Sequence, residues 1–520
     1  MSICIRASSV PARYTPCLDM LLRNSLWHLS GSALPALVAL ATVPLMIRGL
    51  GLEGFGVVML ITSVVGYFGV LDVNLSAGSI KFLAEHHARQ DHRRFAETFW
   101  FGVGFYVLLG VLVSALLLLF ADSLLEHFFK VSSDVRHDAL LGLHIAALGF
   151  APLQLQNYLL VVPQALQRFD RSASGEAFFG VIANLASAAA ALQGAGISGV
   201  LSARVIVSLL NLLWLIWLIR QLAMPLAPAL PRPEVWRSLA HFSAYSWLSR
   251  TASMLHQYAD KLIVGALAGP VALALYTVPS QLATRILGLT YRLSAVIYPR
   301  VSALAATGEQ QQLRSLYLDA TRILTFLNCA VLGMIAITGE HFLAEWVGME
   351  FVTLGYPVLL LITAGLLMDS LTTLPSLVND GLGHPKISGR FAIARGLLGV
   401  GMVWLGTSSF GIMGAASAHL LCSFVMTCLF LAYVHGRTVP SSLQETLRQC
   451  WVPAITVCAG ALLLMLPLQW SLPLSLTGLL WLALLSGSSL LLAGWLFIAR
   501  VEERTELRLF TRRLLPRVSR

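Results

Sequence analysis

Arginine and lysine residues inside long apolar segments are the side chains of this chain best able to bind a charged ligand. Arg250 and Lys261 are eleven residues apart, which places them on one stripe of a helix, roughly 16 Å apart along its axis. Arg285 and Arg292 share a face of the following apolar segment, and Arg204 lies in an earlier one. A charge at the bilayer centre is costly unless it faces a cavity or a partner. The five cations therefore predict a cationic lumen that binds an anionic substrate.

Another interpretation applies to cations near the ends of their segments. Long basic side chains can extend to the membrane interface, and Arg292 lies close enough to the cytoplasmic end of its segment to do so. Arg204, Arg250 and Arg285 lie deeper. We therefore favour the lumen interpretation for these three.

Acidic residues within the apolar segments are fewer, and three of them are candidates for ion coupling. Asp72 and Asp369 lie inside predicted spans, and Asp260 is next to Lys261. A buried carboxylate can carry a proton or bind Na⁺ in a coupled transporter. The same carboxylates can instead be structural partners of the cations, and both interpretations stay open.

The composition indicates which elements hold these residues. The 520 residues are 57% hydrophobic and 12% charged, whereas about 25% of the residues in a soluble domain are charged. An apolar run of about 20 residues spans a bilayer as a helix, and about fourteen such runs follow one another, among them 176–193 and 320–339. The predicted fold class is an all-α integral membrane protein.

The sequence repeats itself weakly after about 215 residues. Residues 196–203 (GISGVLSA) return as residues 411–418 (GIMGAASA), and the basic loop 81–94 falls opposite residues 299–312. Duplicated membrane bundles are typical of secondary transporters, whose substrate sites lie between the two halves. We expect two six-helix repeats followed by two additional C-terminal helices.

The expected organisation has six consecutive parts. They are a cytoplasmic N-terminal tail (1–23), a first six-helix lobe (24–220), a cytoplasmic linker (221–238), a second six-helix lobe (239–436), two additional transmembrane helices (437–499) and a basic cytoplasmic tail (500–520). Each boundary follows the ends of the apolar runs and the charged stretches between them.

The loops differ in basic content, which predicts the orientation of the chain. Most of the 35 Lys and Arg residues fall on the side that holds both termini, whereas the loop with Glu340, Glu345 and Glu350 carries none. Because basic loops stay in the cytoplasm, we expect both termini inside the cell. The net charge of +10 then faces anionic lipids of the cytoplasmic leaflet, and we expect no nucleic-acid partner.

Motifs for catalysis and metal binding are missing from the sequence. It contains no GxxxxGK[ST], HExxH or CxxC pattern, which argues against ATP hydrolysis. His86, His87 and His92 share a loop with arginines that would repel a metal ion, so a solvated basic loop is the better interpretation. We expect no enzyme activity, no catalytic residue, no metal site and no cofactor.

Four segments carry a resemblance to a known family. They are residues 49–56 (GLGLEGFG), 258–267 (YADKLIVGAL), 274–276 (ALY) and 298–302 (YPRVS). These segments resemble the polysaccharide biosynthesis protein family, which comprises O-antigen and exopolysaccharide-unit flippases and belongs to the multidrug/oligosaccharidyl-lipid/polysaccharide exporter (MOP) superfamily. The resemblance covers residues 24–436, and Ala274 departs from it because the family often has Gly there.

The resemblance implies two six-helix lobes that form a V and open alternately to the two sides of the membrane. It implies a bacterial inner-membrane flippase that moves a polyprenyl-diphosphate-linked oligosaccharide from the cytoplasmic to the outer leaflet for surface polysaccharide assembly. Membrane lipids, a polysaccharide polymerase and chain-length proteins are the further partners implied. The charges agree with this cargo, because Arg forks match phosphate oxygens. Gln154, Gln156, Asn157 and Asn184 would contact the sugar or, alternatively, form interhelical hydrogen bonds.

Other functions stay open from the sequence. A lipid II-type cell-wall precursor flippase shares the fold. A multidrug/cation antiporter of the same superfamily would need an acidic lumen, in contrast to the basic lumen predicted here. A membrane glycosyltransferase or polymerase generally needs large external loops or acidic catalytic motifs, which the sequence lacks. A structural subunit of a polysaccharide assembly complex is the remaining alternative.

Overall fold

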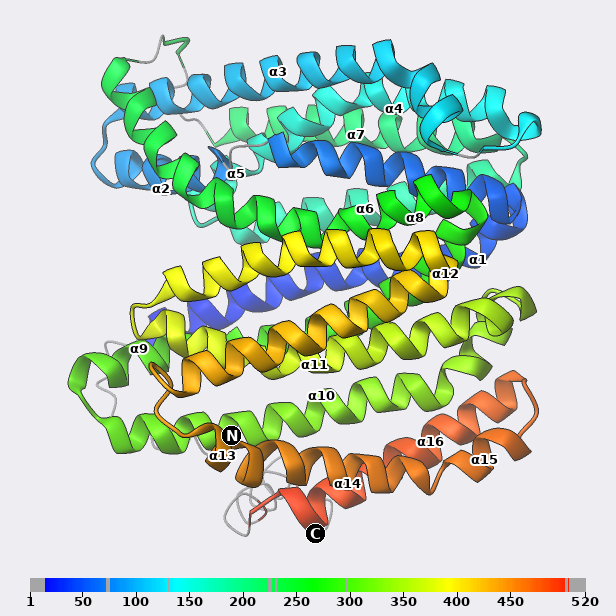
Figure 1. Cartoon of the computed structure of the whole chain (residues 1–520). Coiled ribbons are helices and arrows are strands. Elements are labelled where there is room, and N and C mark those ends of the chain that lie inside the picture. Colours follow the sequence, from blue (N-terminus) through cyan, green and yellow to red (C-terminus); the bar gives the residue numbers. More distant parts are fainter. Residues whose placement is uncertain are drawn as a thin grey trace, which may run out of the picture. The chain divides into compact units, whose positions relative to one another are not determined.

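Helices make up all the regular secondary structure that is described for this chain (Figure 1). The computed structural model describes residues 15–71, 75–129, 131–222, 227–229, 232–295, 297–500 and 504. Within these residues, 11 helices are long and apolar enough to cross a membrane. The predicted all-α membrane class is therefore confirmed for the described part of the chain.

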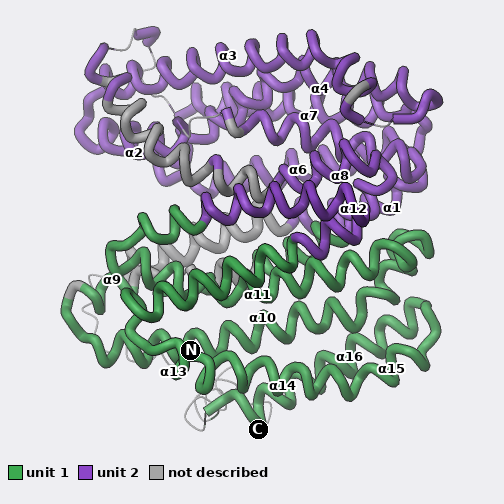
Figure 2. The backbone as a smooth tube through the Cα atoms, viewed as in Figure 1, with its two compact units in different colours: residues 1–21, 279–391, 419–520 green, residues 22–278, 392–418 purple. Residues whose placement is uncertain are grey.

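The chain divides into two compact units, each assembled from separate stretches of sequence (Figure 2). Unit 1 holds residues 1–21, 279–391 and 419–520, and unit 2 holds residues 22–278 and 392–418. Unit 2 extends beyond residue 220, where the first lobe is predicted to end. One reason is close packing onto the first helix, where Gly66 lies against the ring of Tyr258 and Gly265 lies against Leu60.

Unit 2 contains the N-terminal helices and the first part of α8 (Pro233–Ala295). The preceding elements are α1 (Thr15–Tyr67), η2 (Phe68–Leu71), α2 (Leu75–Ala88), α3 (His92–Ser123), η3 (Leu124–Phe128), α4 (Ser133–Leu159), α5 (Val161–Ala165), α6 (Phe169–Leu192) and α7 (Gly196–Gln221). α3 packs on α4, and α7 packs on both α4 and α6 (Figure 1). α3, α4, α7 and α6 therefore follow one another as packed neighbours within this unit.

The larger part of unit 1 starts within α8 and includes the C-terminal helices. Its later elements are α9 (Tyr298–Thr307), α10 (Gln310–Trp346), η4 (Phe351–Gly355), α11 (Tyr356–Gly381), α12 (Pro385–His435), α13 (Leu443–Thr446), η5 (Leu447–Trp451), α14 (Val452–Leu463), α15 (Leu466–Ser471), α16 (Leu476–Ala493) and η6 (Gly494–Ile498), with part of α12 assigned to unit 2. α10 packs against α11, α14 and α16. The two C-terminal helices are therefore packed into the core of unit 1.

Three of the longest helices contain a sharp turn. α12 has 51 residues, so a straight helix would be about 75 Å long, more than twice the ~30 Å hydrocarbon core of a bilayer. Phe410 and Gly411 leave helical geometry and fold it into two arms. Gly51 in α1 and Gly269 in α8 do the same, with φ values of 71° and 87° that glycine adopts without steric cost.

The outer surfaces of the helices are strongly apolar. Leu119 is 75% exposed, Leu491 is 76% exposed and Phe410 is 78% exposed. Exposure of such side chains to water is unfavourable by about 25 cal/mol per Å², whereas acyl chains solvate them. The apolar exterior therefore fits helices that face lipid.

Tyrosines fix α4 against α3 inside unit 2. Tyr158 donates a hydrogen bond to the carbonyl oxygen of Phe99 at 3.1 Å, and its ring lies 5.0 Å from that of Tyr106. Gly102 leaves the room that the Tyr158 ring occupies, because a Cβ there would overlap it. The Tyr106 hydroxyl is hydrogen-bonded to Ser76 Oγ at 2.7 Å. These contacts hold the C-terminal half of α4, which carries several cavity residues, in a defined position.

Candidate functional site

A cavity of about 520 Å³ lies within unit 2, between α1, α4, α6 and α7. Most of its wall is apolar, and each of the four helices adds polar side chains. The polar residues of the lining are Thr62, Gln156, Asn157, Glu176, Asn184, Arg204, Ser208 and Asn211. A concave, mostly apolar cavity with a few convergent polar groups is typical of a small-molecule site.

Arg204 supplies the positive charge of this cavity. Its Nε donates to Ser187 Oγ and its Nη1 donates to Thr62 Oγ1, both at 3.1 Å. The Ser187 hydroxyl donates its own proton to the carbonyl of Ala183, and the Thr62 hydroxyl donates to the carbonyl of Val58, both at 2.7 Å. Each hydroxyl oxygen therefore offers lone pairs to the guanidinium. Neutral acceptors on α6 and α1 hold the cation in place.

The charge of Arg204 is not cancelled by an ion pair. Within the described side chains, no carboxylate lies within salt-bridge distance of it, and its hydrogen bonds go to hydroxyl oxygens. A guanidinium has five N–H donors, so several remain after these two bonds. The free donors and the positive charge suit a phosphate-like anion. Arg204 as a substrate-binding residue remains a prediction, now with a defined cavity around it.

Glu176 also lines the cavity, and the sequence analysis missed it. The predicted span 176–193 begins at Glu176, so the sequence analysis put this carboxylate at the end of a span and not inside it. α6 begins at Phe169, so Glu176 lies about two turns inside the helix. The signal that could have found it is a carboxylate inside a membrane-spanning helix. The lining thus carries one residue of each charge, whereas the sequence predicts a mainly basic lumen.

Three of the four polar residues expected near a sugar line this cavity, and the fourth, Gln154, does not. Gln156, Asn157 and Asn184 all line it. Gln156 Oε1 accepts from Ser208 Oγ at 2.7 Å, which joins α4 to α7, and Asn184 Nδ2 donates to the carbonyl of Gly180 at 2.8 Å. The two interpretations therefore coexist, since Gln156 makes an interhelical hydrogen bond and also faces the cavity.

Lys261 and Asp260 form an ion pair elsewhere in unit 2. Lys261 Nζ is 3.1 Å from Asp260 Oδ1, and the two side chains are 16% and 15% exposed. Tyr276 Oη donates to Asp260 Oδ2 at 3.0 Å, across the turn at Gly269. The residues behind the family resemblance therefore join the two arms of α8. The charge of Lys261 is balanced by Asp260, and neither residue lines the cavity of Arg204.

The other predicted site residues are placed differently or fall outside the description. Arg285 lies on α8 in unit 1 with an exposed side chain, and Asp369 is half-buried on α11 in the same unit. Asp72 and the side chains of Arg250 and Arg292 lie outside the described residues. The substrate-binding and ion-coupling roles of these five residues stay predictions.

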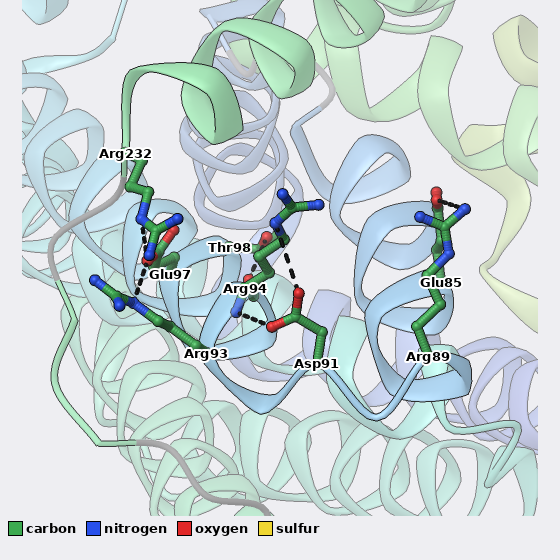
Figure 3. Close-up of polar contacts among 8 residues, drawn as sticks. All are labelled: Glu85, Arg89, Asp91, Arg93, Arg94, Glu97, Thr98 and Arg232. Atoms are coloured by element: carbon green, nitrogen blue, oxygen red, sulfur yellow. Dashed lines mark hydrogen bonds and ion pairs between the residues drawn. The ribbon is translucent and has the colours of Figure 1, made fainter.

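Ion pairs surround the start of α3 (Figure 3). Glu97 is 1% exposed, and its Oε1 accepts from Arg93 Nε at 3.1 Å and lies 3.4 Å from Arg232 Nε. Arg232 directly precedes α8, so this contact ties the connection between α7 and α8 to α3. A buried carboxylate that lost its partners would be strongly destabilising, which gives these two arginines a structural role.

The loop between α2 and α3 is held by local contacts. Asp91 caps α3, where its Oδ1 accepts from the backbone N–H of Arg94 at 3.0 Å (Figure 3). This hydrogen bond, supported by the Arg94 charge, lowers the pKa of Asp91. Burial lowers the pKa of His86, whose ring stacks on Phe82 with centroids 6.3 Å apart. The packed His86 ring departs from the solvated loop that the sequence predicts.

Comparison with known proteins shows the family to which this chain belongs. The sequence pattern of the family described as polysaccharide biosynthesis protein matches residues 21–305, more than half of the chain. The chain belongs to this family. The matched region contains every residue of the Arg204 cavity and the Asp260–Lys261–Tyr276 contact of α8.

Two relatives extend the comparison over more of the chain. A Shigella flexneri protein, described by its name as an O-antigen transporter, is 23% identical over 423 residues, which are 80% of this chain and 98% of that protein. A Haloferax volcanii protein, described by its name as the low-salt glycan biosynthesis flippase Agl15, is 23% identical over 226 residues, covering 44% of this chain and 48% of that protein.

A solved structure shares the fold. The structure of the lipid II flippase MurJ in an inward closed conformation superposes with a TM-score of 0.70 and 13% identity. The match covers 94% of this chain and 100% of that chain. At this identity the likeness concerns the fold alone.

Proposed function

We propose that this protein flips a polyprenyl-diphosphate-linked oligosaccharide from the cytoplasmic to the outer leaflet by alternating access, for surface polysaccharide assembly. The observation that carries the proposal is Arg204, a cation held in a 520 Å³ cavity by neutral acceptors. Membership of the polysaccharide biosynthesis protein family and the relatives named as an O-antigen transporter and a glycan flippase support this substrate class.

The chemistry of the cavity suits the headgroup of such a lipid. A diphosphate carries negative charge that is costly to move through hydrocarbon, and a fixed guanidinium offsets that cost. The amides of Gln156 and Asn157 lie in the same lining and can exchange hydrogen bonds with sugar hydroxyls. The polyprenyl chain needs no polar site, because it can stay in the surrounding acyl chains.

A finer layout also belongs to this proposal. It has fourteen transmembrane helices, of which twelve form two six-helix repeats and two follow at the C-terminus. Counting the two arms of α1, α8 and α12 separately supports the number. Residues with positive φ recur at intervals of 215–218 residues, which supports the repeat. The pairs are Gly51 and Gly269, Gln90 and Gly308, Gln167 and Gly383, and Gly196 and Gly411.

The setting of the protein is part of the same proposal. We place it as a multi-pass protein of a bacterial inner membrane with both termini in the cytoplasm, on the basis of its basic loops. The lobes are proposed to be residues 24–220 and 239–436. A polymerase and chain-length proteins are the proposed partners, and the protein itself transports its cargo without catalysing a chemical reaction.

Complementation of a flippase-deficient strain tests the function. Arg204→Gln should abolish surface polysaccharide, and Arg204→Lys should restore part of it, because lysine keeps the charge but loses the fork. Arg171→Gln is the matched control, since Arg171 lies on the exposed surface of α6, with 50% of its side chain accessible. Equal amounts of each variant in the membrane fraction are required. Normal export by Arg204→Gln would contradict the proposal.

A cation antiporter is the second candidate, and Glu176 is the observation that favours it. Its carboxylate lies in the same cavity as Arg204 and would attract a cationic substrate. Efflux of a lipophilic cation by cells that express the protein distinguishes the two. The flippase proposal expects no efflux above the background of empty cells, whereas efflux that Glu176→Gln abolishes and Arg204→Gln spares would favour the antiporter.

A further inference from the structure

A second polar cavity, far smaller than the first, lies inside unit 1. Its volume is about 10 Å³, close to that of a single water-sized sphere. It is bounded by the second arm of α8, α10 and α11. Its polar lining residues are Ser294, Thr321, Thr325, Asn328, Ser370 and Thr373. Six hydroxyl or amide groups therefore surround a space that holds one small particle.

Asn328 is the residue that points to a ligand. It lies near the middle of α10, in a predicted apolar span, and is 6% exposed. Its Oδ1 is buried and has no hydrogen-bond partner among the described residues. A buried polar atom without a partner costs about 1–3 kcal/mol. A ligand in the adjoining cavity would satisfy this oxygen.

Two of the surrounding hydroxyls have lone pairs available to the cavity. The Thr321 hydroxyl donates its proton to the carbonyl of Tyr317 at 2.7 Å, and the Ser370 hydroxyl donates to the carbonyl of Leu367 at 2.8 Å. With these protons committed to the helix backbones, the oxygens act as acceptors toward any ligand. Together with Asn328 Oδ1 they form a set of acceptors, which suits a cation.

We infer that this cavity is a binding site for one dehydrated Na⁺ ion, ligated by Asn328 Oδ1 and the surrounding hydroxyl oxygens. Hydroxyl and amide oxygens are hard ligands, as alkali cations require, and no carboxylate lies in the lining, so a divalent ion would stay under-neutralised. The small volume disfavours the larger K⁺. Arg322 is the cation nearest to Asn328 along α10, and its Nη2 lies 3.9 Å from Asp319 Oδ1.

The position of the site suits a coupling ion, and that role rests on the proposed flippase function. Ser370 directly follows Asp369, the carboxylate predicted for ion coupling, on α11. The cavity also joins three separate helices, so an ion there stabilises one packing arrangement of α8, α10 and α11 over others. A ligand shifts a conformational equilibrium only by its difference in affinity for the two states.

Thermal unfolding of the purified full-length protein tests binding without any transport assay. We expect NaCl to raise the unfolding midpoint by about 2 °C over choline chloride at equal ionic strength, because a ligand of the folded state stabilises it. KCl should have a smaller effect. Binding of ²²Na⁺ should saturate at one ion per chain.

Variants of the lining decide between an ion and a water molecule. Asn328→Leu keeps a similar volume and should remove the Na⁺-dependent shift, while Asn328→Asp should bind Na⁺ at least about tenfold more tightly. Thr338→Val is the matched control on α10, because the Thr338 hydroxyl bonds to the carbonyl of Met334 outside the cavity lining. This control should keep the full shift.

The outcomes separate the site from the flippase proposal. Equal unfolding midpoints in NaCl and choline for both the unchanged protein and Asn328→Asp would show that the cavity holds only water and would overturn the inference. A Na⁺ shift that survives in Asn328→Leu would also overturn it. If Na⁺ binding changes in the Asn328 variants as expected but the rate of lipid flipping does not depend on Na⁺, the site is supported and its coupling role is removed.

Discussion

Two polar cavities in the described part of the chain differ in size and charge. The cavity of unit 2 has a volume of about 520 Å³ and carries Arg204 and Glu176, whereas the cavity of unit 1 has a volume of about 10 Å³ and a neutral lining. Hydroxyl groups act similarly in both. In unit 2 they donate to the helix backbone and orient a fixed cation, and in unit 1 they donate to the backbone and face a small space.

The difference suggests a division of labour between the two units. A large cavity with a built-in cation can accept an anionic headgroup and its sugars, which a water-sized space cannot. A small acceptor-lined space can select a bare ion, which a large and wet cavity would leave hydrated. A substitution in the cavity of unit 2 should therefore impair substrate binding, and a substitution in the cavity of unit 1 should impair Na⁺ binding.

Filling the large cavity should have the largest effect. Ala183 lines it from α6, and Ala183→Phe places a ring in the space proposed for the substrate. We expect lipid flipping in proteoliposomes to fall at least about tenfold. Ala189→Phe is the control on the same helix, because Ala189 is exposed and lies outside the cavity lining. Equal flipping by the two variants would mean that this cavity is not on the transport path.

Crossed variants should separate the two cavities. Asn328→Leu should leave the affinity for polyprenyl diphosphate within about twofold while it removes the Na⁺-dependent stabilisation, since it lies in the neutral cavity. Glu176→Gln should leave the Na⁺ shift unchanged, because Glu176 lies in the large cavity of unit 2. Isothermal titration gives the affinity for polyprenyl diphosphate and thermal unfolding gives the Na⁺ shift, each for both variants. Loss of both properties in either variant would contradict separate roles for the two cavities.

A polar contact outside both cavities should affect stability and not ligand binding. Tyr276→Phe removes the hydrogen bond to Asp260 across the turn of α8, and hydrogen bonds to charged groups contribute about 1.5–3 kcal/mol. The unfolding midpoint should fall while the Na⁺ shift persists. Tyr67→Phe is the control, because the Tyr67 hydroxyl has no hydrogen bond to a described residue. An altered Na⁺ shift in Tyr276→Phe would link α8 to the small cavity.

The helix cap at Asp91 should give the smallest effect. Asp91→Ala removes the bond to the Arg94 N–H and should cost about 1 kcal/mol, seen as roughly fivefold faster amide exchange in the first turn of α3. The folded state lowers the pKa of Asp91 below its usual value of 3.8, so the cap stabilises above that pH and weakens as pH falls through the lower, folded pKa. An effect of the substitution that stays constant down to pH 2 would contradict this role.

The sequence predicted the fold class because apolar composition and run length are direct consequences of a lipid environment. It placed Arg204 in a lumen shared with Lys261 and Arg285, whereas the structure places Arg204 at a cavity within unit 2 that neither of these residues lines. It missed Glu176 because that residue stood at the boundary of a predicted span. It missed Asn328 because a neutral amide in an apolar run gives no charge signal, and only the packing of three helices leaves its oxygen without a partner.

The sequence left open which carboxylates pair with the predicted cations. Lys261 was expected on a lumen stripe, yet its charge lies beside Asp260, and Tyr276 completes the contact from the other arm of α8. That contact depends on the turn at Gly269, which folds one long apolar stretch back on itself. The family motif therefore has a structural explanation in α8.

Direct binding of polyprenyl diphosphate to the purified protein in lipid nanodiscs tests the central claim about Arg204. The neutral polyprenol of the same chain length isolates the contribution of the phosphates. The account predicts that Arg204→Gln weakens diphosphate binding at least about tenfold, that Arg204→Lys has an intermediate affinity, and that polyprenol binding is unchanged in both. Equal affinity of the unchanged protein and Arg204→Gln for the diphosphate would contradict it.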